Sequence, residues 1–213
     1  MTDIIIIIIL IILINEYKNH TICNYINTES MTSNTDLREY KIISGMQNPQ
    51  SAVNKMAMLN NFMLEFLRKL KTKFLVEKKG HRLEKEFVRR VIKNYNPDVI
   101  FENNPRPGEE TSFVTNKGEN FGICLRNKTN NDLHRDNILK FVIIHELTHL
   151  GTTTYGHDYQ FWSWMKFMVT QAHLFGMYEP IDYSKNPKMY CGDKVNDNPY
   201  YNANFNWLSP KAN

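Results

Sequence analysis

Two histidines and a glutamate stand together in the segment HELTH, as His145, Glu146 and His149. Residues four apart in a helix lie one above the other on the same face, so both imidazoles can reach one metal ion. Glu146 projects beside them and suits the general base for a metal-activated water. Two imidazoles and a carboxylate on an apolar helix would be costly to bury without a partner charge. The pattern therefore predicts a Zn²⁺ site and a zinc-dependent peptidase.

A catalytic zinc ion takes three protein ligands and keeps one position open. The metzincin extension needs glycine at position 152 and histidine at 155, where the chain has Thr152 and Tyr155. A thermolysin-like glutamate would follow the second histidine by about twenty residues, but the next glutamate is Glu179. His157 follows a loop with glycines at both ends. We therefore expect His157 as the third ligand, with Asp158 as the alternative.

Several other side chains are candidates for secondary roles. His173 falls on the polar side of the next expected helix and is predicted to lie on the surface. A tyrosine near the pocket could assist the reaction, and the sequence does not rank Tyr155, Tyr159 and Tyr190. A hairpin is expected from strands 111–115 and 120–125, and its edge could hold an extended peptide by strand addition.

The expected elements combine helices with a few short strands. Apolar residues recur at helical spacing from about residue 51 to 79, and a second amphipathic helix follows Gly80. Residues 98–102 are predicted to form a strand. The segment ILKFVIIHELTHL is apolar nearly all round, which is typical of a buried central helix. We expect Asp136 or Asn137 to cap this helix and Gly151 to follow its end.

The first 50 residues are expected to lie outside the fold. Ile4 to Ile14 form an unbroken Ile/Leu run that is too short to cross a bilayer as a straight helix. A short membrane anchor remains an alternative for this run. Residues 15–50 are polar and without clear periodicity, which indicates a tail. The domain is therefore predicted to span residues 51–213, and its C-terminal part after Gly176 to wrap irregularly.

Charge and cysteines suggest where the chain acts. The stretch from Arg68 to Lys93 holds eleven Lys/Arg and three Glu, so it could bind nucleic acid or form the solvated face of two helices. Three cysteines, Cys23, Cys124 and Cys191, match no zinc knuckle or disulfide framework. This favours a reducing, intracellular compartment, cytoplasmic or nuclear, with Cys124 and Cys191 as small buried side chains.

The segment HELTHL, a short loop and then GHDYQFW resembles the WLM metalloprotease family, which is related to the SprT/Spartan proteases. The likeness covers about residues 50–200 and includes compact WLM-like proteins of large DNA viruses. It implies a minimal zincin-like α+β domain with a buried active-site helix, flanking helices and a small sheet. It also implies His145, His149 and His157 as ligands and Glu146 as catalytic base. Phe161 or Trp162 matches the family's aromatic beside that helix.

Family members digest proteins crosslinked to DNA, so the resemblance implies substrates of that kind. In a departure from the family pattern, no modifier-binding segment is expected after the catalytic region of this sequence. The leading hypothesis is thus a zinc endopeptidase that acts on a protein or peptide substrate. A catalytically silent zinc-containing module that binds DNA or protein is the second reading. A membrane-tethered processing peptidase, anchored by Ile4 to Ile14, is the third.

Overall fold

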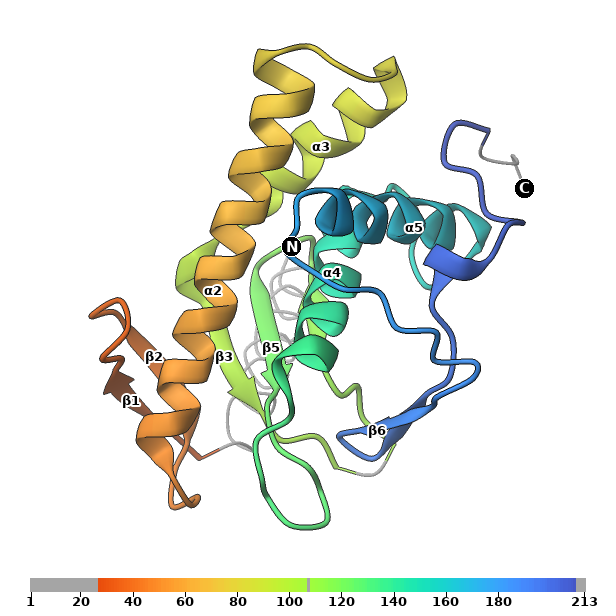
Figure 1. Cartoon of the computed structure of the whole chain (residues 1–213). Helices are drawn as coiled ribbons and strands as arrows, with labels where there is room; N and C mark the ends of the chain where they lie inside the picture. The colour runs from red at the N-terminus through yellow and green to blue at the C-terminus, as the bar shows by residue number, and fades with distance from the viewer. Residues whose placement is uncertain (1–26, 107, 210–213) are drawn as a thin grey trace, which may run out of the picture.

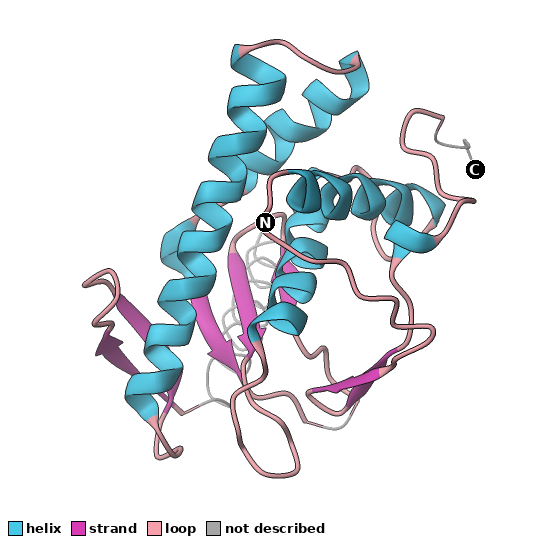
Figure 2. Cartoon of the chain, in the orientation of Figure 1, coloured by secondary structure: helices cyan, strands magenta, loops and turns pink. Residues whose placement is uncertain are grey.

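The computed structural model describes residues 27–106 and 108–209. Helices lie against a five-stranded sheet, and a separate two-stranded sheet follows near the C-terminus (Figures 1 and 2). The elements in chain order are β1 (Thr28–Thr32), β2 (Glu39–Ile43), α2 (Pro49–Lys71) with a π-helical extension (Thr72–Val76), α3 (Arg82–Asn94), a 3₁₀ turn (Pro97–Val99), β3 (Ile100–Asn103), β4 (Phe113–Thr115), β5 (Asn120–Cys124), α4 (Asp136–Gly151), α5 (Tyr159–Leu174), β6 (Lys188–Tyr190), β7 (Asp193–Val195) and a second 3₁₀ turn (Pro199–Tyr201). The predicted α+β class is confirmed.

The five strands run in the order β1-β2-β3-β5-β4. β2 and β3 are parallel, as are β3 and β5, whereas the two outer pairs are antiparallel. The predicted hairpin of β4 and β5 is confirmed, with Thr115 opposite Asn120. Asn116, Lys117 and Gly118 make its turn with positive φ. β4 is consequently an edge strand, which leaves one side of its backbone without a strand partner.

The prediction that residues 1–50 lie outside the fold is wrong for residues 28–43. These residues form β1 and β2, and β2 pairs with β3 through Lys41 and Phe101. Tyr40, Ile42 and Ile43 are buried, whereas most of β1 faces solvent. Three apolar side chains next to polar ones give too weak an alternation to identify a strand from sequence. The Ile4 to Ile14 run lies outside the described residues, and among residues 27–209 no helix has the length and hydropathy to cross a membrane.

The helical predictions around Gly80 are confirmed. α2 buries the apolar face that was expected, from Met56 to Leu70, and its π-helical extension buries Phe74. Gly80 has φ +81°, and a Cβ atom there would lie 2.6 Å from the Phe74 ring. Glycine thus permits a tight reversal that brings α3 back along α2. His81 then caps α3, with its side chain accepting from the Leu83 amide.

α4 is the central helix, and eleven of its residues are buried. Its capping differs from the prediction, because the N-cap position is Arg135 and makes no side-chain hydrogen bond. Gly151 is also the last residue of the helix rather than the residue after it. A Cβ atom at Gly151 would lie 2.4 Å from Phe87 Cε2 and 2.5 Å from Val91 Cγ2. Glycine therefore serves the close approach of α3 to α4, not a left-handed helix end.

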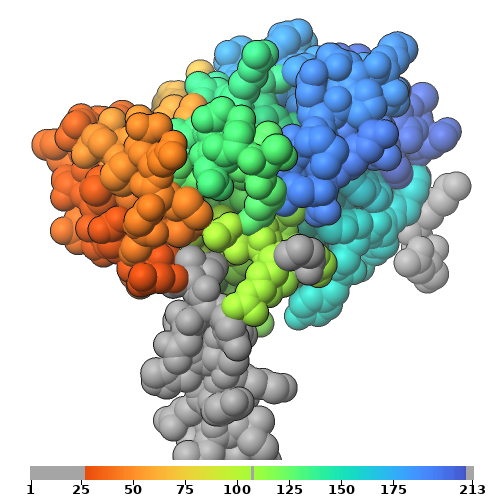
Figure 3. All heavy atoms as spheres, turned by 90° about the horizontal axis from the view of Figure 1, so that it is seen from below, coloured from red at the N-terminus to blue at the C-terminus, as the bar shows by residue number. Residues whose placement is uncertain are grey.

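The segment after Gly176 is more ordered than predicted. It contains the β6–β7 hairpin and a 3₁₀ turn, and Trp207 returns to α3 to donate to Glu84 Oε1 at 2.9 Å. Seen from below, the chain after β5 (green) lies between the N-terminal strands (orange) and the C-terminal segment (blue) (Figure 3). The domain therefore extends from β1 to the C-terminal segment, around the buried α4.

Candidate metal centre and cleft

The C-terminal half of α4 carries His145, Glu146 and His149, as the spacing predicted. The loop of residues 152–158 then reverses the chain, and Gly156 takes φ +76° there. This loop brings the His157 ring back over the helix. Three ring nitrogens meet as a result: the Nε2 atoms of His145 and His157 are 2.9 Å apart, those of His149 and His157 are 3.1 Å apart, and those of His145 and His149 are 3.2 Å apart.

This geometry fits a metal ion better than hydrogen bonding. Each imidazole Nε2 carries either a proton or a lone pair, so among three mutual contacts at least one pair of nitrogens is alike. No arrangement of protons makes all three contacts favourable, whereas a cation can accept three lone pairs at once. Two ligand atoms of a tetrahedral zinc ion lie about 3.3 Å apart. The observed separations fall within a few tenths of an ångström of that distance, and the three histidines form the one such cluster found among the described residues.

Asp158, the alternative ligand, has another role. Its Oδ1 accepts the Phe161 amide at 2.8 Å and caps the N-terminus of α5. His173 lies near the opposite end of α5, with Nδ1 3.6 Å from Glu179 Oε2. That separates both His173 and Glu179 from the histidine cluster. His157 is therefore the side chain that completes the group.

Two aromatic rings support the cluster. Phe161 is fully buried, and its ring centroid lies 4.8 Å from that of His145, 4.3 Å from that of His149 and 4.7 Å from that of His157. Trp162 lies farther away, at 6.0 Å from His145 and 5.7 Å from His157. Phe161 is thus the residue packed directly behind all three rings, and it fixes their orientation.

Burial favours the neutral forms of these groups in the metal-free protein. It lowers the pKa of His145, with a further lowering from His149 and His157. Burial, His157 and Lys117 likewise lower the pKa of His149 to about 4. Burial, with the Glu110 carboxylate second, raises the pKa of Glu146 to about 8. The histidines therefore present lone pairs at neutral pH, and a cation beside Glu146 would favour its carboxylate form.

The last turn of α4 is held from outside the helix. Lys117, in the β4–β5 turn, donates Nζ to the carbonyl oxygens of Thr152 at 2.8 Å and His149 at 3.3 Å. Asn94 Nδ2 donates to the Leu150 carbonyl at 2.8 Å, and Arg90 Nε donates to that of Gly151 at 2.6 Å. These donors satisfy the carbonyls that a helix end leaves without partners. They also keep the backbone that carries His149 in place.

A cleft of about 580 Å³ opens over the histidines. β4 and the loop before it form one wall, including Glu110, Phe113 and Val114. The β6–β7 hairpin and the residues after it form the other, including Val195 and Asp197. Glu146 reaches the cleft although it is only 4% exposed. The edge strand that was predicted from the hairpin thus lines the same cleft as the three histidines.

The three candidate tyrosines have different environments. The Tyr190 hydroxyl is buried and committed to Ser112 Oγ at 2.6 Å and to the Cys124 carbonyl at 2.7 Å. The Tyr159 hydroxyl donates to the Asn204 carbonyl at 2.8 Å. Tyr155 is 88% exposed at the cleft, and Lys117 Nζ lies 5.1 Å from the centroid of its ring. Tyr155 is therefore the candidate best able to meet a ligand.

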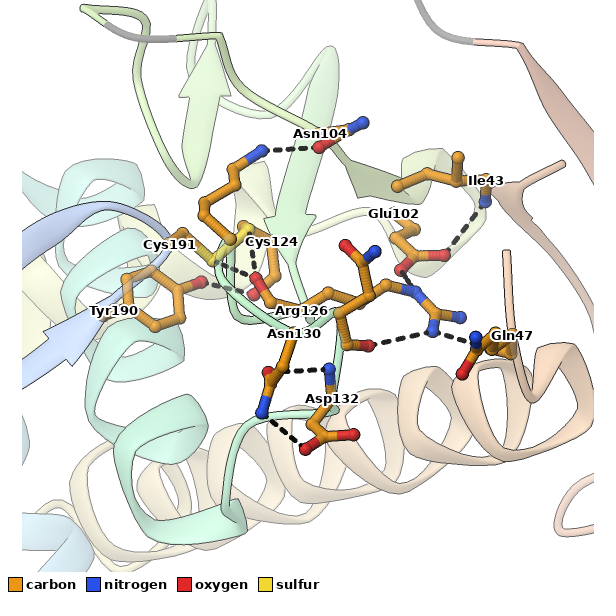
Figure 4. A network of polar contacts seen from close by, with 12 residues as sticks. Ile43, Gln47, Glu102, Asn104, Cys124, Arg126, Asn130, Asp132, Tyr190 and Cys191 are labelled. Atoms are coloured by element: carbon orange, nitrogen blue, oxygen red, sulfur yellow. Dashed lines mark hydrogen bonds and ion pairs between the residues drawn. A yellow bond between two sulfur atoms is a disulfide. The ribbon is translucent and has the colours of Figure 1, made fainter. Parts of the chain in front are cut away.

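Cys124 and Cys191 form a disulfide across 67 residues, which corrects the expectation of two separate small side chains. Both are buried, as predicted, but Cys191 sits in the β6–β7 turn and Cys124 ends β5 (Figure 4). Their Cα atoms are 6.3 Å apart. Only the tertiary fold brings them together, so their spacing in the sequence gave no sign of the bond.

The sequence reasoning missed the β6–β7 wall and the role of Lys117. The β6–β7 hairpin could have been predicted from the segment KMYCGDKV, in which two short strand-like runs flank a two-residue turn that ends in glycine. Lys117 offered no such signal, because its partners are backbone carbonyls of a distant helix end. Both features contribute to the cleft without adding a metal ligand.

Comparisons with known proteins give limited likenesses. No protein-family model matches the chain. An uncharacterized protein of Acanthamoeba polyphaga mimivirus is 32% identical over 94 residues, which are 44% of this chain and 47% of the relative, so the match spans about half of that protein. The crystal structure of a Wss1 mutant from Saccharomyces cerevisiae aligns with a TM-score of 0.43 and 17% identity, over 64% of this chain and 92% of that one. At these values the chain is similar to both, and its function must be argued from its own site.

Proposed function

We propose that the chain is a zinc endopeptidase with a zincin-like fold. The observation that supports this is the set of three histidine Nε2 atoms within 3.2 Å of one another. Glu146 lies on α4 with His145 and His149, and it lines the same cleft as all three histidines. His145, His149 and His157 would hold the ion. A bound zinc ion supplies a Lewis acid and lowers the pKa of water at the site.

The chain's own groups perform the rest of the reaction. Glu146 takes a proton from the attacking water and passes it to the leaving amine nitrogen. Its burial keeps solvent from competing for that proton. An extended substrate would pair with the free edge of β4, which places a peptide backbone along the cleft. Tyr155, exposed at the rim, is the side chain that we assign to contact the substrate.

Replacing the base while keeping the ligands tests the mechanism. Glu146→Gln should retain one zinc ion per chain and lose about 10²-fold or more of casein-cleaving activity, because general-base assistance is worth about 10²–10⁴. Glu179→Gln is the matched control, since Glu179 is exposed and pairs with His173, and it should change neither zinc content nor cleavage. His157→Ala should lose the zinc. Equal cleavage by wild type and Glu146→Gln would refute the mechanism.

The same measurement distinguishes a silent binding module. Zinc bound in wild type without cleavage of casein or histone substrates would favour that reading over a peptidase. The substrate path has its own test: Glu146→Gln can hold an uncleaved peptide, so the amides of β4 should exchange hydrogen more slowly in the complex. Unchanged exchange in β4 would exclude strand addition there.

We also propose that the basic α2–α3 hairpin binds nucleic acid through the turn between its helices and the exposed side of α3, which would bring the peptidase to DNA-associated proteins. Lys78 is exposed in the turn between the two helices, and Arg89 and Lys93 are exposed farther along α3. Arg90 belongs to the same basic stretch but caps Gly151, so it is left intact in the test. Neutralising Lys78, Arg89 and Lys93 to Gln should weaken DNA binding and reduce its dependence on salt. Unchanged affinity would assign these cations to solvation.

A further inference from the structure

One wall of the cleft is not paired, strand to strand, with the five-stranded sheet in the described part of the chain. Among the strands of residues 27–106 and 108–209, β6 and β7 pair with each other alone, in a two-stranded sheet separate from the five-stranded one. An isolated hairpin is marginally stable in water, so its position depends on the contacts it makes. Yet this hairpin and the residues just after it line the cleft with Tyr190, Asp193, Lys194, Val195 and Asp197. Whatever fixes the hairpin therefore sets the width of the cleft.

The Cys124–Cys191 disulfide is the covalent attachment of this wall (Figure 4). It joins the hairpin turn to the end of β5, the strand beside β4. Three hydrogen bonds act at the same point. Tyr190 contacts Ser112 and the Cys124 carbonyl, and the Cys191 amide donates to His134 Nε2 at 3.2 Å. These polar contacts would remain after reduction, so loss of the disulfide should loosen the wall without detaching it.

The turn itself indicates that the sulfur is needed at this position. Cys191 has φ +51° and Gly192 has φ +99°, which are the left-handed conformations of a two-residue hairpin turn. Asparagine, aspartate or glycine normally takes the first of these positions, whereas other side chains are strained there. Cysteine at position 191 accepts that strain and gains a bond to Cys124. If the turn had no covalent attachment, asparagine, aspartate or glycine would fit position 191 with less strain than cysteine.

The reduced form also has a place for both thiols. The Arg126 carbonyl oxygen lies 3.6 Å from Cys124 Sγ and 3.3 Å from Cys191 Sγ. In the disulfide the sulfurs carry no proton and cannot donate to it. After reduction each thiol finds this acceptor already in position. The surroundings thus accommodate the oxidised and the reduced pair without rearrangement of β5.

We propose that Cys124 and Cys191 form a reversible thiol–disulfide site that controls the β6–β7 wall of the cleft. The oxidised pair holds the wall against β5, and reduction by a low-molecular-weight thiol such as glutathione loosens it. Its effect on substrate rests on the proposed peptidase function, whereas its effect on the wall does not. The site is distinct from the metal centre, because neither sulfur belongs to the histidine cluster.

The chemistry is thiol–disulfide exchange. A thiolate of the reductant attacks Cys191 Sγ, in the more exposed turn, and forms a mixed disulfide. Cys124 leaves as a thiolate and takes up a proton. A second thiol then displaces Cys191, so two electrons and two protons pass to the protein pair and the reductant leaves as its own disulfide. Because Cys124 is 1% and Cys191 5% exposed, the attack requires the turn to open first.

Hydrogen exchange followed by mass spectrometry tests the proposal on the full chain. Wild type oxidised with glutathione disulfide is compared with wild type reduced by a phosphine. Amides of residues 188–197 should exchange at least about tenfold faster after reduction, while those of α4 stay unchanged. The double variant Cys124→Ser/Cys191→Ser should match the reduced form and ignore the reductant. Cys23→Ser, which leaves the pair intact, should respond as wild type does.

Three outcomes would overturn the proposal. Equal exchange of residues 188–197 in both states would mean that the bond does not hold the wall. Equally accelerated exchange in α4 after reduction would mean that the disulfide stabilises the whole domain rather than the β6–β7 wall in particular. Three free thiols after treatment with glutathione disulfide would mean that the pair does not form. Cleavage assays on the same samples should show that reduction changes kcat/KM in wild type but not in the double serine variant. If the protein cleaves no substrate, the proposed peptidase function fails, while the hydrogen-exchange comparison still tests the effect of the disulfide on the wall.

Discussion

Replacing Gly151 with alanine sets local helix propensity against packing. Gly151 is the last residue of α4, two residues after His149. Within a helix, alanine is more favourable than glycine by about 1 kcal/mol. From propensity alone, Gly151→Ala should therefore stabilise the protein. The structure predicts the opposite sign.

The cost comes from the neighbours of the added methyl group. Its Cβ would lie 2.4 Å and 2.7 Å from two atoms of the Phe87 ring and 2.5 Å from Val91 Cγ2, whereas carbon contacts normally reach about 3.5 Å. Phe87 cannot retreat, because its ring stacks on Trp164 with centroids 4.2 Å apart. Overpacking of this kind costs about 1–3 kcal/mol. Because all three contacts are shorter than 3.0 Å, we take the upper part of this range, about 2–3 kcal/mol. After the propensity gain of about 1 kcal/mol, the net loss should be about 1–2 kcal/mol, or about 2–8 °C in Tm.

Urea unfolding and thermal melts of Gly151→Ala measure this loss. The same substitution in a Phe87→Leu background removes two of the three close atoms and is the control. There it should cost less, with a coupling of about 0.5 kcal/mol or more between the two sites. A Gly151→Ala protein as stable as wild type would show that α3 and α4 are not in close contact.

Three further predictions concern stability. Glu102→Gln should destabilise the protein by about 3–5 kcal/mol in urea unfolding, because it leaves the buried Arg126 guanidinium, 2.8 Å from Glu102 Oε1, without its counter-charge (Figure 4). Adding Arg126→Met should restore much of the lost stability. A Glu102→Gln protein as stable as wild type would contradict the buried ion pair. Burial, with Asp36 second, raises the pKa of Tyr40 to about 12, so the stability from its protonated phenol is complete below about pH 10 and lost as pH rises toward 12. Tyr40→Phe should therefore show a shallower fall of unfolding free energy between about pH 10 and 12, and parallel curves would refute the shift. Chelation of zinc should lower Tm by about 10 °C if wild type binds it at about 10³ times its Kd, with recovery on zinc addition and no response in His157→Ala.

The meeting of His145, His149 and His157 could be predicted because its geometry is local. Two of its residues are one helical turn apart, and His157 follows within a loop too short to leave the vicinity. The apolar run of α4 and the turn at Gly118 also follow from periodicity and backbone preference. Each of these features depends on residues near one another in the chain. Zinc itself and the reaction remain predictions from these residues.

Features that depend on distant partners could not be predicted. β1 and β2 lack a strong alternating pattern, and the remainder of the sheet decides their pairing. The disulfide joins the end of a strand to a turn 67 residues away in the sequence. Gly151 had the position of a helix terminator, but its real constraint is the Phe87 ring on another helix. Arg90 belongs to a run of cations in the sequence, yet it caps a carbonyl of α4 in the fold.

The Lys117 contacts would couple the proposed binding of a peptide at β4 to the geometry of the histidine cluster. One ammonium group in the β4–β5 turn anchors the backbone of α4 directly behind His149. A peptide that extends the sheet at β4 would shift the β4–β5 turn, and Lys117 of that turn holds the backbone that carries the His149 imidazole. Binding of a peptide along β4 should then favour the arrangement in which the three histidine Nε2 atoms meet. A peptide that pairs badly with β4 would leave these nitrogens less well aligned.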